Sequence, residues 1–580
     1  MKKTKSRQPL PVVDVKPKWT WQPYAIAAAA FAVAFMAYGP ALRGPFLFDD
    51  LRLPYTQANA LTVQWTSYLR GVRPLLNILF WWLGRTWGMN PAPYHLLSFT
   101  LHCANTVLVW FILKRLLDAP PAVKPDASEK PAPDQNRERA KSTAAWFGAG
   151  VFLLHPLQTE SVSYIASMSE TLSLLFVFGA FAAFVAWFRD RLGWGKALIV
   201  VALFGLGILT KEHAAALPAV LLFTDFWWNP GFTFAGIRRN WRLYALLVAG
   251  GVLAATVILA VLRTATTAGF GLKDFTWYQY FFTQGRALWV YFRLFVLPVG
   301  QNLDYQFPIS YSPADPFAII GLAVLTGVGI SAWIQRYRFP YASYGFLLFL
   351  LLIAPTSSIV PIQDAVAERR VYLPFIGLLF MLAEVILRWK VNFARQAALA
   401  AVLVVLAVVN WNRNQIYSSS IAMWEDSVKA NPKNARAEFQ LGYAYYQESK
   451  CAIALQHYEK AAALKTWGFE LLTDWALALE CAGEPEKAIE KMKESLKLDR
   501  SAHGYAVLGM IYARQGRNEE GLAALDEAVM MDPSLDLAWA FRGNVLVQKG
   551  DKAAAAASYQ RALALNPSNP VARQGLTVIR

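Results

Sequence analysis

Cysteine and charged residues are both scarce in this sequence. Among 580 residues there are 3 cysteines, and none of them forms the CxxC or Cys/His spacing of a zinc site. Charged side chains make up 16% of the chain and hydrophobic ones 56%, so a soluble protein of this length would lack the charge to cover its surface. The two shortages exclude a cysteine-based metal site and a string of ordinary soluble domains.

Net charge is missing from one part of the chain. The formal charge is +17, yet residues 412–580 contribute nothing to it, because they hold 20 Lys+Arg and 20 Asp+Glu. The basic excess lies before residue 412, where the positive-inside rule explains it better than nucleic-acid binding does. The same part holds 18 of the 22 tryptophans, as aromatic belts at a membrane surface require.

Long apolar runs in this first part predict a polytopic membrane helical bundle. We expect eleven spans, at 24–42, 93–117, 143–157, 171–188, 197–210, 213–228, 241–262, 316–333, 341–360, 372–387 and 396–411. With a cytoplasmic N-terminus, this count puts most basic loops inside and the C-terminal part outside. The stretch 285–299 is short and contains two arginines. It either spans the membrane or forms a re-entrant or surface helix, and the sequence leaves both open.

Three domains follow from this division. Residues 1–23 form a basic cytoplasmic N-terminus, residues 24–411 the membrane domain, and residues 412–580 a periplasmic domain. Within the membrane domain, residues 118–142 are rich in Pro, Ala, Lys and Glu, which predicts a disordered cytoplasmic linker loop. Residues 74–82 are apolar and aromatic but too short to span, which predicts a helix lying in the outer membrane surface.

The C-terminal domain contains an internal repeat. Small residues recur with spacings of 34, 33 and 34, at Gly442, Ala476, Gly509 and Gly543. Small residues twelve positions later and prolines at the ends of units complete the pattern. It resembles the tetratricopeptide repeat, a helical hairpin that buries its apolar face only against its neighbours. We expect an α-solenoid of four repeats, preceded by a partial unit that caps it.

Two cysteines of this domain are predicted to lie at the same end of the helix stack. Cys451 begins the second helix of one repeat, and Cys481 ends the first helix of the next. We expect two small buried thiols, which are common in such helices. A disulfide in an oxidising periplasm is the alternative.

Two adjacent carboxylates, Asp49 and Asp50, follow the first predicted span by a few residues, on the outer side. A carboxylate in this place is suited to act as a general base, or as a metal ligand, above a membrane-embedded substrate. The alternative is a solvated pair in a surface loop.

Further side chains of functional types gather near the same outer face in this topology. They are Arg73, His95, His102, His155, Glu160, Lys211, Glu212, Glu368, Arg369, Arg370 and Tyr372. The first two histidines share one face of the second predicted span with Ser98 and Asn105. Polar groups in hydrocarbon need partners or a cavity, so helix–helix hydrogen bonding is the alternative to a site.

The basic members of this set suit a phosphate. Arg73, Arg369 and Arg370 lie outside, against the charge rule, and Lys211 lies near them in the predicted topology. Arginine offers a planar fork of donors and a permanent charge to phosphate oxygens. The alternatives are anchoring to lipid headgroups and structural ion pairs, in the pairs Lys211–Glu212 and Glu368–Arg369.

Read in chain order, these residues form a set of short motifs. They are Phe-x-Phe-Asp-Asp ending at Asp50, Arg-Pro at Arg73, Tyr-His-Leu at His95, His-Pro-x3-Glu-Ser-Val from His155, Lys-Glu at Lys211, and Glu-Arg-x-x-Tyr-Leu-Pro from Glu368. Together with the repeats, they resemble the transmembrane and tetratricopeptide repeat-containing O-mannosyltransferases and their bacterial relatives, which are glycosyltransferases of the GT-C class. The resemblance covers about residues 24–568.

This resemblance implies an inverting glycosyltransferase in the bacterial inner membrane, acting at the periplasmic face. The donor would be a polyprenyl-phosphate-linked sugar, and the acceptor a protein Ser or Thr hydroxyl held by the repeats. Asp49 or Asp50 would be the base, the four cations would bind the donor phosphate, and the histidines, glutamates and tyrosine would support them. We expect no obligatory metal or other cofactor, although a carboxylate pair can bind a divalent metal, and no nucleic-acid partner.

Two other functions stay open from the sequence. The same chemistry could act on a lipid or cell-surface glycan, with the repeats serving assembly. Alternatively, the chain is a catalytically inert membrane-anchored scaffold that binds peptides. The sequence names neither the sugar nor the acceptor.

Overall fold

The computed structural model describes residues 21–54, 63–119, 121, 135–264 and 267–579. Within these ranges the regular structure is helical, apart from an isolated β-bridge between Ala268 and Ile362. The predicted all-α class is therefore confirmed for the described residues. Most of the predicted basic N-terminus, 1–23, lies outside them, as does the central part of the predicted linker.

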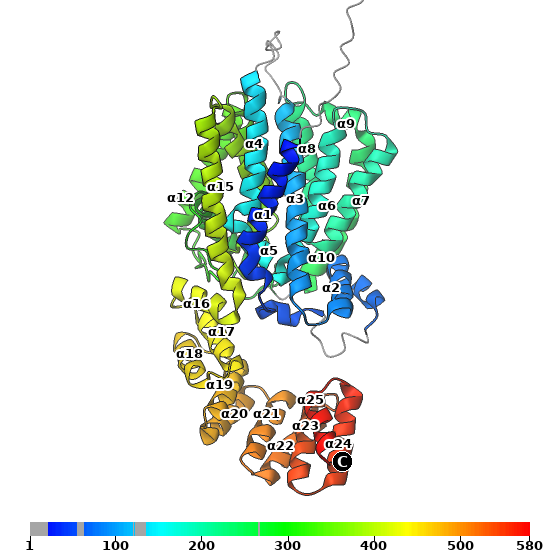
Figure 1. Cartoon of the computed structure of the whole chain (residues 1–580), viewed down its shortest axis with the longest axis vertical. Coiled ribbons are helices and arrows are strands. Elements are labelled where there is room, and N and C mark those ends of the chain that lie inside the picture. The colour runs from blue at the N-terminus through cyan, green and yellow to red at the C-terminus, as the bar shows by residue number, and fades with distance from the viewer. Residues whose placement is uncertain (1–20, 55–62, 120, 122–134, 265–266, 580) are drawn as a thin grey trace, which may run out of the picture.

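The N-terminal part of the chain, up to α15, forms a helical bundle (Figure 1). Its main helices are α1 (Gln22–Leu42), α3 (Ala92–Asp118), α4 (Gln135–Leu154), α6 (Met168–Trp187), α7 (Trp194–Thr210), α8 (Leu217–Trp228), α10 (Trp241–Thr264), α11 (Trp277–Val296), α12 (Pro316–Ile334), α13 (Pro340–Ile353), α14 (Phe375–Leu387) and α15 (Phe393–Asn414). Every predicted span overlaps one of these helices.

Five segments among the described residues are long and apolar enough to cross a membrane, judged by length and composition. They are Tyr24–Leu42, Ala92–Asp118, Ile165–Trp187, Pro316–Tyr337 and Phe393–Ser418. Shorter apolar helices accompany them, among them α7 and α13. The predicted count of eleven spans and the domain boundaries at 24, 411 and 412 stay predictions.

The ambiguous stretch 285–299 belongs to α11, which begins earlier, at Trp277, with a reciprocal cap between Thr276 and Gln279. This helix packs closely on α12, because a Cβ atom at Gly321 would lie 2.0 Å from the carbonyl oxygen of Gly285. Helix α11 therefore packs against a candidate span. Whether α11 itself crosses the membrane stays a prediction.

The predicted disordered linker at 118–142 is wrong at its C-terminal end. Helix α4 begins at Gln135, so residues 135–142 are helical. An ion pair between Glu138 and Lys141, 2.7 Å long and one turn apart, supports this start. Buried Ala140 continues the packed face of α4 past the charged residues. The predicted surface helix at 74–82 is confirmed as a helix, α2 (Pro74–Trp87).

The C-terminal domain is a stack of helical hairpins that continues from α15 and curves below α2 (Figure 1). After α16 (Ser420–Ala430), the pairs are α17 (Ala435–Gln447) with α18 (Cys451–Leu464), α19 (Phe469–Cys481) with α20 (Pro485–Leu498), α21 (Ala502–Arg514) with α22 (Asn518–Met531), and α23 (Asp536–Gln548) with α24 (Lys552–Leu565), followed by α25 (Pro570–Ile579). These are the four predicted repeats. The recurring small residue lets paired helices approach, since a Cβ atom at Gly543 would lie 2.4 Å from the ring of Tyr559.

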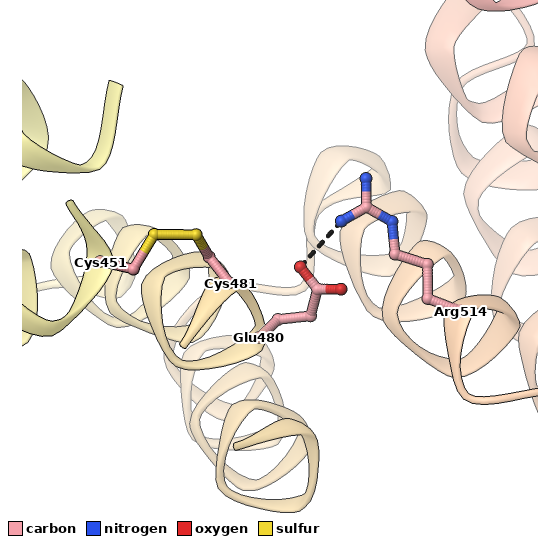
Figure 2. The surroundings of a disulfide bond; sticks show 4 residues. All are labelled: Cys451, Glu480, Cys481 and Arg514. Atoms are coloured by element: carbon pink, nitrogen blue, oxygen red, sulfur yellow. Dashed lines mark hydrogen bonds and ion pairs between the residues drawn. A yellow bond between two sulfur atoms is a disulfide. The ribbon is translucent and has the colours of Figure 1, made fainter. Parts of the chain in front are cut away.

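The expectation of two free thiols in this domain is wrong. Cys451 and Cys481 form a disulfide, with their Cα atoms 6.0 Å apart. Figure 2 shows that it joins the start of α18 to the end of α19, next to an ion pair between Glu480 and Arg514. The two helix ends lie side by side because adjacent repeats stack in register, which puts the two cysteines within bonding reach.

The repeat domain packs on one end of the bundle, which we call the tail end. Arg436 of α17 donates to both carboxylate oxygens of Asp304 at 2.6 Å, and to Asp364 at 2.8 Å. Phe48, which follows α1, meets Trp424 of α16 edge to face with ring centroids 5.1 Å apart. Charged and aromatic contacts therefore tie the first repeat to the loops of the bundle.

Candidate functional site

One short segment of the tail end connects the acidic pair with several other residues of the predicted site. It runs from Thr159 to Glu170 through α5 (Thr159–Ser163), the 3-10 turn η5 (Ile165–Ser167) and the first turn of α6. We call it the 159–170 segment. Nearly all of it is buried, and its side chains and backbone contact both the acidic pair and two of the predicted cations.

Asp50 lies in the 3-10 turn η1 (Phe48–Arg52) and is 0% exposed. One carboxylate oxygen accepts from the backbone N–H of Leu47 at 2.9 Å, and the other from that of Ala166 at 2.6 Å. Burial raises the pKa of Asp50, while the two backbone donors act in the opposite direction. Because both carboxylate oxygens accept hydrogen bonds from backbone N–H groups, Asp50 holds this loop in place.

Asp49 has a different environment, although it is the adjacent residue. Its backbone N–H donates to the hydroxyl of Tyr164 at 2.9 Å, which ties it to the 159–170 segment. Its side chain is half-buried and makes no hydrogen bond or ion pair with the described residues. Phe48, directly before it, has a φ of 41°, and strained backbone of this kind persists where the surroundings hold it. Asp49 thus presents a carboxylate with free lone pairs.

Two of the predicted phosphate-binding cations form ion pairs beside this segment. Lys211 donates to Glu170 at 2.5 Å and to Ser169 at 3.0 Å. Arg73, which has a φ of 56° at the start of α2, donates from two nitrogens to Glu212, the shortest distance being 3.0 Å. The alternative of structural ion pairs therefore holds for both cations, but with partners other than the pair Lys211–Glu212. Lys211 has an extended backbone, and the side chains of sequence neighbours in extended backbone point to opposite faces.

Arg369 and Arg370 lie in the turn η8 (Glu368–Val371) and have different partners. Arg369 pairs with Glu160 through its guanidinium, and its backbone N–H donates to the same carboxylate at 2.8 Å. Arg370 donates to the hydroxyl of Tyr280 at 3.1 Å and to the carbonyl oxygen of Ala365 at 3.0 Å. Among the described residues Arg370 forms no ion pair. The carboxylate of Asp364 acts on it only through space, and that carboxylate is itself paired with Arg436.

The ion pair Glu368–Arg369, named above as an alternative, does not form, because Glu368 points to another loop. Its carboxylate accepts from the backbone N–H of Asn302 at 2.9 Å, the amide of Gln301 at 2.5 Å and the hydroxyl of Tyr305 at 2.6 Å. It is buried, and burial raises its pKa. Glu368 holds the loop that carries Asp304 toward the repeats.

Two predicted histidines connect helices. His102 contacts the hydroxyl of Tyr372 at 2.8 Å and the carbonyl oxygen of Leu153 at 3.1 Å, which joins α3, α4 and the start of α14. His155 contacts the carbonyl oxygen of Phe295 at 3.0 Å. These contacts correspond to the helix–helix alternative.

His95 is different, since it is buried next to the backbone of Gly44 and Ser163, behind the acidic loop. Neither of its ring nitrogens makes a hydrogen bond to a described residue. Its role stays a prediction.

Sequence reasoning did not select three contributors to this arrangement. Tyr164, Tyr280 and the Arg436–Asp304 pair all take part through contacts between distant segments. A lone tyrosine carries no spacing signal. Within the described ranges, no three His, Cys, Asp or Glu residues are grouped so that they could hold a metal ion. Metal independence stays a prediction.

Comparisons with known proteins agree with this architecture. The tetratricopeptide repeat family matches residues 406–466, 473–536 and 507–570, which confirms the predicted repeats. A protein O-mannosyl-transferase of Caenorhabditis elegans is 22% identical, over 71% of this chain and 58% of that protein. Protein O-mannosyl-transferase TMTC3 of Homo sapiens is 21% identical, over 83% of this chain and 56% of that protein. The repeat protein YrrB is 18% identical over 31% of this chain and 89% of that chain, with a TM-score of 0.24.

The chain spans little more than half the length of these two curated relatives. It is a distant relative of the protein O-mannosyl-transferases, as the motifs and repeats predict.

Proposed function

We propose that this chain is an inverting glycosyltransferase of the GT-C class. It moves a monosaccharide from a polyprenyl-phosphate donor to a Ser or Thr hydroxyl of a protein, at the periplasmic face of a bacterial inner membrane. The observation that carries this proposal is the open carboxylate of Asp49, joined through the 159–170 segment to a group of cations at the tail end. The likeness to protein O-mannosyl-transferases supports the reaction class.

Asp49 is the residue of the acidic pair that is suited to be the base. It takes the proton of the acceptor hydroxyl as the new bond forms from that oxygen to the anomeric carbon. On the opposite face of the sugar, the bond from the anomeric carbon to the phosphate oxygen breaks, and polyprenyl phosphate leaves with the bonding electrons. A positioned base of this kind contributes roughly 10² to 10⁴ in rate.

The leaving phosphate needs positive charge that is not already neutralised. Arg73, Lys211 and Arg369 each have a carboxylate partner, so these pairs leave little net charge. Arg370 is bound by a phenol and carbonyl oxygens, which orient the guanidinium without forming an ion pair. The carboxylate that acts on it through space, that of Asp364, is already paired with Arg436. Arg370 is therefore the principal phosphate ligand in this proposal, and the paired cations would reorient toward a bound anion.

In this proposal the repeat domain presents a polypeptide to the site, and its contact with the bundle supports that role. A cavity of about 240 Å³ lies where α17 and the loop after α18 meet the bundle, lined among others by Gln306, Asp364, Arg436 and Trp467. The backbone of Asp364 in its wall also accepts from Arg370. The disulfide between Cys451 and Cys481 supports a periplasmic location, because disulfides persist in oxidising compartments.

Glycopeptide mass spectrometry of envelope proteins tests the proposal. Cells with the wild-type chain are compared with cells carrying Asp49→Asn, at equal membrane abundance. The matched control is Asp118→Asn, which changes an exposed aspartate at the other end of α3. We expect a hexose mass on Ser or Thr peptides that disappears only with Asp49→Asn.

Unchanged glycopeptides would refute protein O-glycosylation as the function. Loss of a glycolipid or surface glycan in the same cells would then assign the alternative acceptor, and no change in any glycan would support an inert scaffold.

A further inference from the structure

A basic cavity lies at the end of the bundle opposite the repeats, which we call the far end. Two contacts define this end: the indole N–H of Trp228 donates to the carbonyl oxygen of Ala119 at 2.9 Å, and the hydroxyl of Tyr341 donates to that of Leu117 at 3.3 Å. They join the last residues of α3 to the end of α8 and the start of α13. The functional site described above lies at the tail end, so this cavity is separate from it.

The cavity has a volume of about 440 Å³ and opens between α4, α13 and the end of α14. Five basic side chains line it: Arg137, Lys141, Arg338, Arg388 and Lys390. They come from three segments far apart in sequence. A site this size accommodates a phosphodiester headgroup, whose charge is opposite to that of the lining.

The single carboxylate in the lining is already used. Glu384 accepts from the backbone N–H of Tyr341 at 2.9 Å and from the guanidinium of Arg388 at 2.7 Å. Lys141 is paired with Glu138 outside the lining. The three remaining cations are Arg137, Arg338 and Lys390. All three side chains are exposed, and none forms an ion pair with a carboxylate among the described residues. Three cations that form no ion pair with a described residue therefore line this cavity. Glu138, which acts on Arg137 through space, lies outside the lining.

The surroundings of the cavity are those of a membrane surface. Trp389 and Tyr337 are in its wall, and Trp389 is 43% exposed. Amphipathic aromatic side chains of this kind sit at the level of lipid headgroups. The far end also bounds the apolar helices long enough to span. Basic pockets between membrane helices at such a level bind anionic headgroups.

We propose that this cavity is a binding site for the phosphate headgroup of an anionic phospholipid. Arg137, Arg338 and Lys390 contact the phosphate, and Arg388 is held by Glu384 at its edge. The site requires a membrane and does not depend on the glycosyltransferase reaction.

Native mass spectrometry of the purified full-length chain tests this site. The protein in detergent is titrated with phosphatidylglycerol, with zwitterionic phosphatidylcholine, and with phosphatidylglycerol in the presence of excess inorganic phosphate. The variant is Arg137→Gln/Arg338→Gln/Lys390→Gln. The matched control, Arg191→Gln/Lys196→Gln/Arg238→Gln, removes three exposed cations near the far end that lie outside the cavity.

We expect the wild type to retain phosphatidylglycerol in preference to phosphatidylcholine. Each neutralised cation should weaken binding roughly fivefold, so the triple variant should lose about a hundredfold, while the control stays within about twofold. Lys390→Gln alone changes an exposed side chain, and its fivefold loss checks the site even if the triple variant folds poorly.

Equal retention by the cavity variants and the wild type would overturn the proposal, as would an equal loss in the control. Displacement of the lipid by inorganic phosphate at a similar headgroup concentration would also overturn it, since the site would then bind free phosphate.

Discussion

The acidic pair provides the sharpest test of the site, because two adjacent residues of the same type should behave in opposite ways. Asp49→Asn removes a carboxylate that has no hydrogen bond among the described residues. Its effect on the free energy of unfolding should stay within about 0.5 kcal/mol, as for other surface substitutions. If Asp49 is the base, the transfer rate should fall roughly 10² to 10⁴-fold.

Asp50→Asn should lower stability and should affect the transfer rate only indirectly. The asparagine side chain keeps one acceptor oxygen, so one of the backbone N–H groups of Leu47 and Ala166 loses its partner. Leaving that buried N–H group without an acceptor costs about 1 to 3 kcal/mol. Because burial raises the pKa of Asp50 to about 8, the carboxyl is largely neutral at pH 7 and the amide gains nothing from removing a charge. A net loss of about 1 to 2 kcal/mol follows for this loop. Activity should fall only as far as the loop loses its conformation.

The assay measures both quantities on the same purified samples. Transfer from a polyprenyl-phosphate sugar to a peptide gives the rate, and hydrogen exchange over residues 44–52 gives the local free energy of opening. The reasoning is refuted if Asp50→Asn abolishes transfer without changing exchange while Asp49→Asn remains active, since the two roles would then be exchanged.

Three further predictions concern the repeat domain. Arg436→Gln leaves Asp304, which is 4% exposed, without its cation, and should destabilise the junction by roughly 1 to 3 kcal/mol, seen as faster proteolysis at residues 415–435. Replacing Cys451 and Cys481 by Ser opens a link of 30 residues, and should lower the stability of the domain by about 3 to 4 kcal/mol in thermal unfolding. Burial raises the pKa of Asp474 to about 7. The folded state therefore holds the proton of this carboxyl more tightly than the unfolded state does. The domain should then lose stability as the pH rises toward and through 7. Asp474→Asn should remove this loss, with protection of α19 against hydrogen exchange exceeding that of the wild type more at about pH 8.5 than at about pH 5.

Each of these has a control in the same domain. Arg542→Gln breaks an ion pair in the last repeat and should leave the junction resistant to protease. Glu490→Gln removes an exposed carboxylate and should leave the pH dependence of α19 unchanged. A reductant that failed to alter thermal unfolding of the wild type would contradict the disulfide prediction.

Much of the fold follows from periodicity. Apolar runs locate the helices of the bundle, because each run must be buried or inserted in the membrane. The spacing of small residues locates the repeats, because Gly442 and Gly543 lie where paired helices touch. Helix ends were less predictable. Residues 135–142 look like linker by composition, and become helical because Ala140 packs on the bundle. The disulfide depended on a register between neighbouring repeats that composition does not encode.

The site was predictable as a set of residues and less so as a set of partners. Arg369 and Lys211 lie beside glutamates in sequence, yet they pair with Glu160 and Glu170 from the 159–170 segment. Adjacent side chains diverge, so partners come from other segments, and only the fold brings those together. The same holds for Asp49 and Asp50, because the difference between them rests on the backbone of Ala166, which no motif marks.

The repeats contribute to the geometry of the proposed site, whatever part they take in binding an acceptor. Trp424 packs on Phe48, the strained residue before Asp49, and Arg436 binds Asp364, whose carbonyl oxygen orients Arg370. Deleting the whole C-terminal domain would therefore disturb the proposed base and the proposed phosphate ligand together. A loss of transfer would then not show that the repeats bind the acceptor.

Removing residues 536–580 alone keeps these contacts and shortens only the C-terminal part of the repeat array. If the array holds a polypeptide, this truncation should raise the KM for long acceptors and leave kcat for a short peptide unchanged. An equal loss for both would mean that the repeats serve the fold of the site alone.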